Sequence, residues 1–365
     1  MFTYPLIKIW AQRKDYIMKR VKNILIVRTD RIGDVVLTTP SIKAVREAYP
    51  NARICVLISS YTVDLIKGNP NIDEIIIDDK YGRHKGIFGF FKLVSTIRKE
   101  KFDLAIIYHT KKRTNALCFL SGIPMRLGYK NNKFGFLLTH PVYDNRVHGI
   151  KHEAEYCLDL LKKIDIKFNG EIKLELPILA HAVDWLKQFL SSSNISNKDL
   201  LIVVHPGASD PSKQWPEELF VKIINKLSRK YQSSKFVVIG AKNLKNIAKN
   251  LCSYTNTNVI NLCGMTTVAE LVSLLNRADL LISNDSGPVH IAAAMNTPVV
   301  SIFTRNQPGI NPERWRPLGP NSTFVSVKPD NSLSFKKSGL ISKKYLYNIS
   351  PDDVLEAVDS VFKVC

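Results

Sequence analysis

The chain has no apolar run long enough to cross a bilayer. A membrane-spanning helix needs roughly 18–20 consecutive apolar residues, and the 365-residue sequence contains no such stretch. Residues 1–20 also lack the pattern of a secretory signal peptide, because Lys8 interrupts a short apolar run and no small-residue cleavage site follows it. We therefore expect the protein to be cytoplasmic.

Cysteines at metal-binding or disulfide spacing are also missing. The six cysteines lie far apart in the chain, and no C-x-x-C occurs. This spacing supports neither a zinc site nor a disulfide framework. Cys55 and Cys118 lie within apolar segments, so we expect both in the hydrophobic core.

Two common ligand-binding motifs are absent as well. No G-x-G-x-x-G follows any expected strand, which disfavours a dinucleotide cofactor. No Asp-x-Asp pair occurs, which argues against a sugar nucleotide held through a divalent metal. We predict a protein that uses neither a cofactor nor a bound metal.

Acidic residues are few in relation to basic ones. There are 32 Asp and Glu against 52 Lys and Arg, which gives a net charge of +20. Such a charge attracts nucleic acid, an anionic lipid surface or a phosphorylated substrate, but it is equally compatible with lysines on solvated faces. Because the basic residues are spread along the chain without a block of five like charges, we expect no nucleic-acid partner.

The first 20 residues combine apolar and basic side chains. Such a segment can lie on an anionic membrane surface. A disordered tail, or translation that begins at Met18, explains the composition equally well. The apolar members are Phe2, Tyr4, Leu6, Ile7, Ile9 and Trp10, and the basic members are Lys8, Arg13, Lys14, Lys19 and Arg20.

Along the rest of the chain, β-rich runs alternate with segments of helical periodicity. This alternation predicts βαβ units on parallel sheets. The expected strands are 21–28, 53–59, 73–77, 104–108, 200–204, 235–239, 259–261, 280–283 and 298–303. The expected helices are 35–49, 61–68, 88–100, 152–164, 183–190, 215–231, 243–253, 268–277 and 288–295. Between residues 115 and 145 we expect mainly loops.

A small, polar stretch without periodicity, residues 191–199, is the best candidate for an interdomain linker. On its two sides we expect Rossmann-like doubly wound domains, residues 21–190 and 200–349. The predicted class is therefore α/β, with a central cleft at the carboxyl ends of the strands. The other segments are a basic extension, residues 1–20, and a C-terminal helix, residues 350–365, capped by Ser350 ahead of Pro351.

The stretch Asn284–His290 directly follows the apolar run Leu280–Ser283. It predicts a buried strand, a tight glycine turn and a helix that begins at Pro288. The free N–H groups and the positive end of the helix dipole favour an anion at such a helix start. With Asp285 and His290 beside it, this turn predicts a site for a phosphorylated ligand.

A second polar turn, Thr29–Asp34, follows the first strand. Asp34 lies near the expected start of the next helix, where a carboxylate commonly serves as the helix cap. A carboxylate at the rim of a cleft can also act as a general base toward an acceptor hydroxyl. Both roles of Asp34 stay open, and Asp30 is the weaker candidate for the base.

Loops after two further strands add polar groups. The small residues of His205–Ser209 leave backbone N–H groups that can meet phosphate oxygens. Lys213 is either a solvated loop lysine or, at the same sheet edge as the anion-binding turn, a positive charge for a leaving pyrophosphate; we favour the second role. We expect the turn at Gly240 near a nucleoside, and structural or acceptor-contact roles for His109 and His152.

Three segments of the chain form an ordered set: Arg28–Pro40, Lys213–Glu218 and Asn284–Ala294. They resemble the motifs of glycosyltransferase family 9, the heptosyltransferases that build the inner core of lipopolysaccharide. Shorter stretches at 122–124, 126–129 and 152–156 are also similar to that family. The resemblance extends over residues 21–320.

The resemblance implies an inverting, metal-independent transferase with the B-type glycosyltransferase fold, in which Asp34 is the general base and Lys213 neutralises the donor diphosphate. It also implies ADP-heptose as the donor and an anionic glycolipid at the cytoplasmic face of the inner membrane as the acceptor. With the loops described above, the donor-binding residues are Ser209, Lys213, Gly240, Asp285, Ser286, Gly287 and His290. The acceptor-binding residues are Asp30, Arg31, His109 and Arg126.

The chain departs from the family after the turn Gly240-Ala241. Heptosyltransferases place an acidic residue there to hold the ribose, whereas the segment 242–245 contains none. The donor's base and sugar therefore stay open. A sugar-nucleotide epimerase of similar two-domain architecture is the alternative function, and a basic nucleic-acid-binding module is the third.

Overall fold

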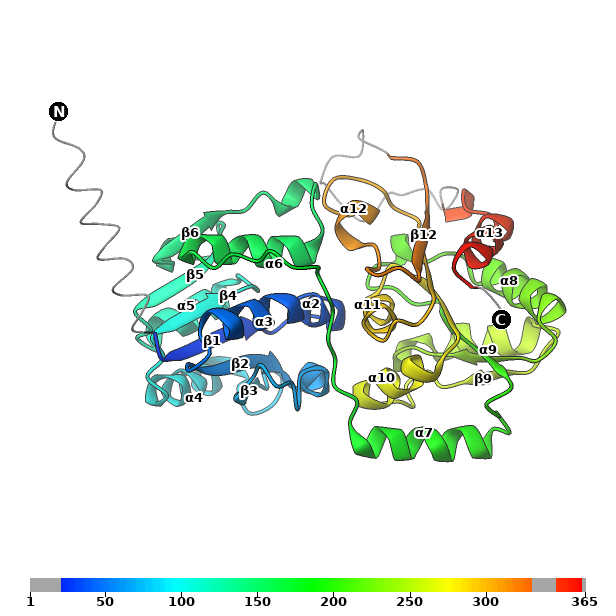
Figure 1. Ribbon diagram of the computed structural model, residues 1–365, viewed down its shortest axis with the longest axis horizontal. Helices are drawn as coiled ribbons and strands as arrows, with labels where there is room; N and C mark the ends of the chain where they lie inside the picture. Colours follow the sequence, from blue (N-terminus) through cyan, green and yellow to red (C-terminus); the bar gives the residue numbers. More distant parts are fainter. Residues whose placement is uncertain (1–20, 330–345, 363–365) are drawn as a thin grey trace. The chain divides into compact units, whose positions relative to one another are not determined.

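A computed structural model describes residues 21–329 and 346–362 (Figure 1). The extension considered as a membrane anchor, residues 1–20, lies outside this range. The chain divides into two compact units. Unit 1 comprises residues up to Asp30, Thr38–Asp144 and Ala154–Glu171, and unit 2 comprises Arg31–Leu37, Asn145–Glu153 and Ile172 onward. This division differs from the expected continuous boundaries, because three parts of the expected first domain, residues 31–37, 145–153 and 172–190, belong to unit 2.

Unit 1 is built on a parallel six-stranded sheet with the order β3-β2-β1-β4-β5-β6. Its strands are β1 (Asn23–Arg28), β2 (Arg53–Ser59), β3 (Glu74–Asp78), β4 (Leu104–Ile107), β5 (Met125–Lys130) and β6 (His140–Tyr143). Its helices are α3 (Thr39–Ala48), η1 (Ser60–Leu65), α4 (Gly86–Lys99), α5 (Lys112–Leu120), η2 (Gly135–Leu137), α6 (Glu153–Leu161) and η4 (Lys162–Ile164). One face of the sheet shares a hydrophobic core with α4 and α5. Cys55 and Cys118 are buried in that core, as predicted.

Unit 2 repeats this plan with the order β12-β11-β10-β7-β8-β9. Its strands are β7 (Leu200–His205), β8 (Ser234–Val238), β9 (Val259–Asn261), β10 (Leu280–Asn284), β11 (Val299–Phe303) and β12 (Ser322–Ser326). Its helices are α2 (Ile32–Val36), η3 (Arg146–His148), α7 (Ala180–Ser192), η5 (Pro211–Lys213), α8 (Glu217–Lys230), η6 (Lys242–Leu244), α9 (Lys245–Tyr254), α10 (Val268–Arg277), α11 (Gly287–Ala294), α12 (Pro312–Trp315) and α13 (Pro351–Val361).

Both sheets have the strand order of a Rossmann-like domain. In each sheet the order reverses beside the first strand, between β1 and β4 in unit 1 and between β7 and β10 in unit 2. Ligands of open α/β sheets bind at the carboxyl ends of the strands at this reversal. The two parallel sheets with their helices confirm the predicted fold class. The loops after β1, β4, β7 and β10 lie at these reversals and are therefore the candidate ligand-binding loops.

Several expected elements differ from those observed. The helix expected over 35–49 is two helices, because α2 ends at Val36 and Pro40, which cannot donate a backbone hydrogen bond, fits only the first turn of α3. In place of the α-helix expected over 61–68 there is a 3₁₀ helix, η1, over Ser60–Leu65. The region expected to be loops contains α5, β5 and β6. The periodicity of α5 is weak because it buries the polar residues Thr114 and Asn115.

The C-terminal helix α13 packs against α8, and the two helices share one hydrophobic core with α9 (Figure 1). Ser350 caps α13 as predicted, since its hydroxyl accepts from the Asp353 N–H. Ion pairs join the exposed sides of α8 and α13, with Lys226 Nζ 2.8 Å from Asp352. Among the described residues, no helix combines the length and apolar character needed to span a membrane.

Candidate functional site

The turn after β10 in unit 2 has the expected strand–turn–helix form. Asn284 ends the strand, and α11 begins at Gly287 with Ser286 as its N-cap residue. Asn284 is fully buried and holds two loops, because its amide donates to the Pro206 carbonyl at 2.7 Å and accepts from the Trp215 N–H at 3.0 Å. The helix start is thereby fixed beside the loop that follows β7.

Two buried histidines flank this helix start. Nδ1 of His205 lies 3.0 Å from the Ser286 hydroxyl, and burial lowers the pKa of His205 to about 4. Burial, with smaller contributions from His152 and Lys213, lowers the pKa of His290 to about 3. Both imidazoles are therefore neutral at pH 7. Within the described part of the chain, Nδ1 of His290 has no hydrogen-bond partner although the residue is only 3% exposed.

The short helix α2 packs against α11 at very close range. A Cβ atom on Gly33 would lie 2.7 Å from Cδ2 of His290, and one on Gly287 would lie 3.0 Å from the Ile32 side chain. Only glycine fits both positions without displacing a neighbour. The segment Arg31–Leu37 therefore belongs to the compact unit that holds the turn after β10.

Asp34 is the third residue of α2 and is half-buried. The N-cap residue of that helix is Arg31, so the helix-cap alternative for Asp34 is excluded. Arg31 also contacts the loop after β7, since its Nη1 donates to the Ser209 hydroxyl at 3.1 Å. The geometry thus brings the helix of Asp34 together with Ser209, Ser286, Gly287 and His290.

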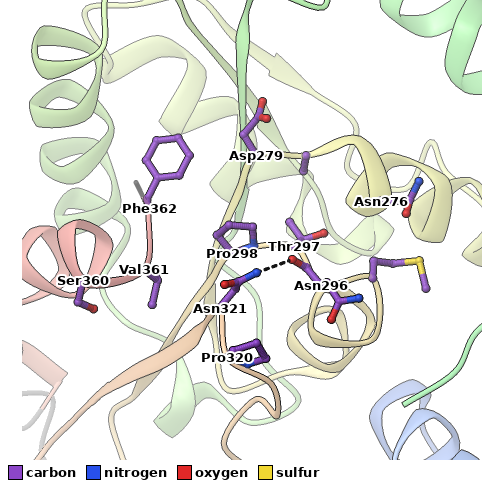
Figure 2. A pocket seen from close by; sticks show the side chains of 12 residues that line it. Asn276, Asp279, Asn296, Thr297, Pro298, Pro320, Asn321, Ser360, Val361 and Phe362 are labelled. Carbon is purple, nitrogen blue, oxygen red and sulfur yellow. Dashed lines mark hydrogen bonds between the residues drawn. The ribbon is translucent and has the colours of Figure 1, made fainter. Parts of the chain in front are cut away.

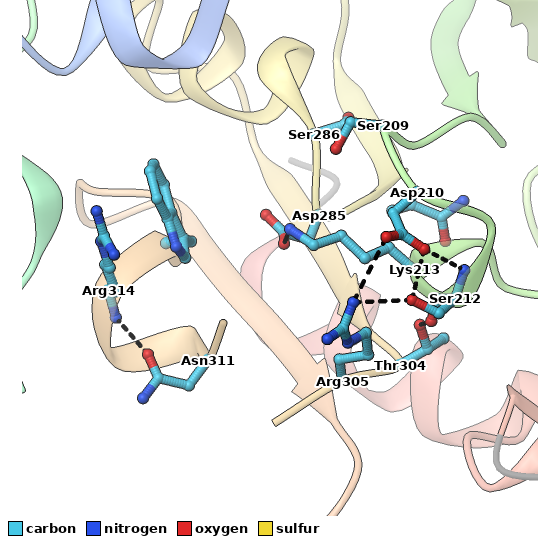
Figure 3. A network of polar contacts seen from close by, with 12 residues as sticks. Ser209, Asp210, Ser212, Lys213, Asp285, Ser286, Thr304, Arg305, Asn311 and Arg314 are labelled. Carbon is cyan, nitrogen blue, oxygen red and sulfur yellow. Dashed lines mark hydrogen bonds and ion pairs between the residues drawn. The ribbon is translucent and has the colours of Figure 1, made fainter. Parts of the chain in front are cut away.

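Lys213 and Asp285 form an ion pair across two loops of unit 2 (Figure 3). Their side chains are only 16% and 9% exposed, so Lys213 is not a solvated loop lysine. Lys213 ends η5, whose N-cap Asp210 accepts from the Ser212 N–H at 2.9 Å. The charged end of Lys213 is therefore held at the carboxyl edge of the sheet.

Arg305 is a cation of this site that the sequence reading missed. Its Nη1 donates to the Ser212 hydroxyl at 2.9 Å and lies 3.7 Å from the carboxylate of Asp210 (Figure 3). The residue is buried, and its Nε has no hydrogen-bond partner among residues 21–329 and 346–362. The available signal was its position two residues after β11, at the same sheet edge as the anion-binding turn.

Gly240 lies after β8, where its neighbours pack closely. A Cβ atom there would lie 2.6 Å from Cδ1 of Leu244 and 3.2 Å from Sγ of Cys263. The same Leu244 methyl would lie 2.2 Å from a Cβ on Gly207. Close packing of the two glycine loops on Leu244 thus shapes this end of the site.

In unit 1, two of the expected acceptor residues lie at the reversal between β1 and β4. The Thr29 hydroxyl is 3.0 Å from Nδ1 of His109, and Asp30 pairs with Arg28 at 3.2 Å. Burial, aided by nearby positive charges led by Arg28, lowers the pKa of His109 to about 3. His109 is therefore a neutral residue of the carboxyl edge.

Arg126 does not join this group. It is the second residue of β5 and pairs in register with Ala105 near the start of β4, so it lies toward the amino edge of the sheet. Its guanidinium donates to the backbone carbonyls of Ile123 and Leu137, the latter at 2.7 Å. The stretch around Arg126 that is similar to the family therefore stabilises unit 1. Arg126 lies near the start of β5, whereas His109 follows the end of the parallel strand β4, so the two residues lie at opposite edges of the sheet.

A buried ion pair fixes the segment 145–153 in unit 2. Glu153 is 1% exposed and accepts from Nε and Nη2 of Arg314 at 3.0 and 2.7 Å. His152 is buried beside it, with Nε2 2.9 Å from the carbonyl oxygen of Arg316. Asn311 caps α12 by accepting from the Arg314 N–H (Figure 3). These contacts agree with the structural alternative for His152.

Unit 2 also has a cavity of about 500 Å³ at the opposite, amino edge of β10 and β11 (Figure 2). Its polar lining includes Asn276, Asn296 and Asn321. None of the expected donor residues lines it, so it is separate from the site above. Across the described segments, no group of three or more His, Cys, Asp or Glu side chains is placed to bind a metal ion.

Comparison with known proteins identifies the family. The model of glycosyltransferase family 9 (heptosyltransferase) matches residues 90–345, more than half of the chain. The chain belongs to this family. It is therefore a glycosyltransferase, and the family predicted from the three motifs is confirmed.

Two named relatives align with most of this chain. Lipopolysaccharide heptosyltransferase 3 of Escherichia coli K12 is 27% identical over 336 residues, which cover 90% of this chain and 95% of the relative. Lipopolysaccharide core heptosyltransferase OpsX of Haemophilus influenzae is 27% identical, with 85% of this chain and 86% of the relative covered.

Solved structures share the fold. A glycosyl transferase family 9 protein from Veillonella parvula superposes with a TM-score of 0.83 at 26% identity, covering 93% of this chain and 97% of that one. E. coli ADP-heptose lipopolysaccharide heptosyltransferase II superposes with a TM-score of 0.73 at 21% identity, covering 93% and 98%. The second likeness concerns the fold alone.

Proposed function

We propose that this glycosyltransferase transfers a heptose from ADP-heptose to the inner core of lipopolysaccharide or to a related glycolipid. The relatives named as lipopolysaccharide heptosyltransferases support this substrate class. The observation that carries the proposal is the packing of α2 against α11. It holds the helix of Asp34 beside the anion-binding turn of the same compact unit.

In the proposed mechanism Asp34 is the general base. Its carboxylate takes the proton of an acceptor hydroxyl while that oxygen forms a bond to the anomeric carbon of the donor sugar. The bond from this carbon to the diphosphate oxygen breaks on the opposite face, and its electron pair leaves with the nucleotide. The configuration at the anomeric carbon is inverted.

The leaving diphosphate gains negative charge, and several fixed groups of unit 2 are placed to stabilise it. Lys213 and Arg305 supply positive charge at the carboxyl edge of the sheet, so no metal is required in this scheme. The start of α11, at Ser286 and Gly287, supplies backbone N–H groups and the positive end of its dipole. Donors oriented before the reaction usually give the largest catalytic contribution.

Neutral His290 is proposed as a further donor contact through its buried, unpartnered Nδ1. The loops at Ser209 and Gly240 complete the donor site. For the acceptor we propose contacts from Asp30, Arg31 and His109, which follow β1 and β4. We further propose that the enzyme works at the cytoplasmic face of the inner membrane, where an anionic glycolipid acceptor is exposed.

The substitution Asp34→Asn tests the mechanism. It should lower kcat by about 10²–10⁴-fold and leave the Kd for ADP within about twofold, because it removes the base but no donor contact. Asp184→Asn, on the exposed side of α7, is the matched control and should leave kcat unchanged. Transfer is measured with purified acceptor, and NMR of the product reports the anomeric configuration.

Near wild-type turnover of Asp34→Asn would reject this residue as the base. The same assay with ADP-, UDP- and GDP-sugars tests which nucleotide sugar is the donor. The assay with EDTA tests whether the reaction needs a metal ion. Faster transfer from a UDP-sugar would reject ADP-heptose, and loss of activity in EDTA that magnesium restores would reject the metal-independent scheme.

A further inference from the structure

Unit 1 exposes a row of large apolar side chains at the start of α4 and in the turn before it. Phe88 is 90% exposed, Tyr81 80%, Ile87 67% and Phe91 50%. The next turns of the same helix bury Leu93, Val94 and Ile97 against the sheet. The first turns of α4 therefore present apolar groups to solvent, which usually marks an interaction site.

Polar contacts hold this exposed segment in place. Arg113 donates to the buried carboxylate of Asp78 at 3.1 and 2.9 Å and to the carbonyl of His84 at 3.1 Å. The Asp79 carboxylate accepts from two N–H groups of the following turn, each at 3.0 Å. A Cβ on Gly89 would lie 2.5 Å from the carbonyl carbon of His84, so helix and loop touch. The apolar row is thus a fixed feature of the fold.

The start of α5 connects this row to a second aromatic group. The guanidinium of Arg113 lies 5.1 Å from the ring of Phe90, and Nζ of Lys112 lies 5.7 Å from the ring of Phe134. Phe134 in turn contacts Phe136, which is 77% exposed. We call residues 80–92, 111–113 and 130–136 the aromatic-basic face; its three segments follow the carboxyl ends of β3, β4 and β5 (Figure 1).

Charge is concentrated on the same segments. Residues 80–99 contain six Lys and Arg and no Asp or Glu, and residues 104–143 again contain six and none. These two stretches therefore account for twelve of the net +20 charges, and nine of the twelve lie within the aromatic-basic face. The basic residues are spread along the chain, and the sheet brings parts of the two acid-free stretches together on this face. The exposed members on the face include Arg83, Lys85, Lys92, Lys111, Lys112 and Lys130.

We propose that the aromatic-basic face docks the enzyme on an anionic phospholipid bilayer. Phenylalanine and tyrosine side chains enter the interface between headgroups and acyl chains, while surrounding lysines and arginines bind the negative headgroups. A partner nucleic acid would use the charge but would leave Ile87 and Phe88 without an apolar environment. The inference rests on the proposed function in one respect: a glycolipid acceptor in the membrane is the reason why docking would serve the reaction.

The test uses the full-length enzyme and vesicles without acceptor. Binding is measured by co-sedimentation with phosphatidylcholine vesicles that contain or lack phosphatidylglycerol. The double variant Lys85→Glu/Lys92→Glu should weaken binding to anionic vesicles by about 30-fold or more. Phe88→Ser/Phe91→Ser should weaken it by about tenfold or more, because two apolar groups no longer enter the interface.

Matched controls come from unit 2. Lys222 on α8 and Lys249 on α9 are exposed, and Tyr254 is 70% exposed at the end of α9. Lys222→Glu/Lys249→Glu and Tyr254→Ser should bind anionic vesicles within about twofold of wild type, because they lie outside the aromatic-basic face. Residues 1–20 are present in every variant, so any contribution from them is common to all.

Test variants that bind like their controls would overturn the proposal. So would loss of self-association or of nucleic-acid binding in the test variants with vesicle binding unchanged, since another partner would then occupy the face. Transfer to a detergent-dispersed acceptor should stay at the wild-type rate in all four variants. Failure of that reaction in the wild type, with vesicle binding intact, would reject the proposed function and leave the docking surface standing.

Discussion

At the scale of single residues, the site depends on positions where a side chain has no room. A Cβ atom on Gly33 would lie 2.7 Å from the His290 ring, and one on Gly287 would lie 3.0 Å from the Ile32 side chain. The absence of both side chains lets α2 and α11 pack this closely. Asp34, the residue after Gly33, lies on the helix that this contact holds against α11.

Gly33→Ala should destabilise the protein by about 1–3 kcal/mol, because the new methyl group would overlap the buried ring of His290. Denaturant unfolding measures the loss. Gly170→Ala is the control, since a Cβ there meets its nearest neighbour, Phe168, at an ordinary 3.4 Å. A stability change at Gly33 no larger than at Gly170 would contradict the close packing of α2 on α11.

At the scale of elements, agreement was best where local signals are strong. Helix α10 and strands β2 and β9 have their expected bounds, and the N-terminus of α10 carries a capping box in which Thr267 and Glu270 satisfy each other's backbone N–H. Agreement was poorest in α5 and β5, where burial of polar residues or a glycine obscures the period. Short elements such as α12 depend on distant contacts.

The α12 element is anchored by the buried pair of Glu153 and Arg314. Glu153→Gln should cost about 3 kcal/mol of unfolding free energy, because it leaves the charge of Arg314 without its carboxylate partner in a site that is only 15% exposed. Asp184→Asn breaks the exposed Asp184–Lys187 pair on α7 and should cost less than about 0.5 kcal/mol. Equal costs in urea unfolding would show that the buried pair is not an anchor.

At the scale of the whole molecule, both units bury neutral histidines at the carboxyl edges of their sheets. The pKa values of His109, His205 and His290 are lowered to about 3, 4 and 3, chiefly by burial. In the unfolded chain these groups accept a proton below their ordinary pKa of 6.5. Their contribution to stability is thus fully present above pH 6.5 and is lost as the pH falls toward the folded-state values.

The free energy of unfolding should therefore decrease between pH 6.5 and pH 4.5, by up to about 1.4 kcal/mol per pH unit for each of these histidines. His205→Asn should reduce this slope by the contribution of one histidine, up to about 1.4 kcal/mol per pH unit, because the unfolded chain then gains one proton fewer. The same slope in His205→Asn and wild type would show that His205 is not buried in the neutral form.

The sequence alone determined the alternation of strands and helices, the burial of Cys55 and Cys118 and the polar turns after each strand. These features depend on residues close together in the chain, so periodicity and turn chemistry record them. Only the tertiary structure decided that Arg31–Leu37 packs with unit 2, that Arg305 joins Lys213 at one sheet edge, and that two acid-free stretches form one aromatic-basic face. Each of these depends on contacts between residues far apart in sequence, which only the order of strands in a sheet establishes.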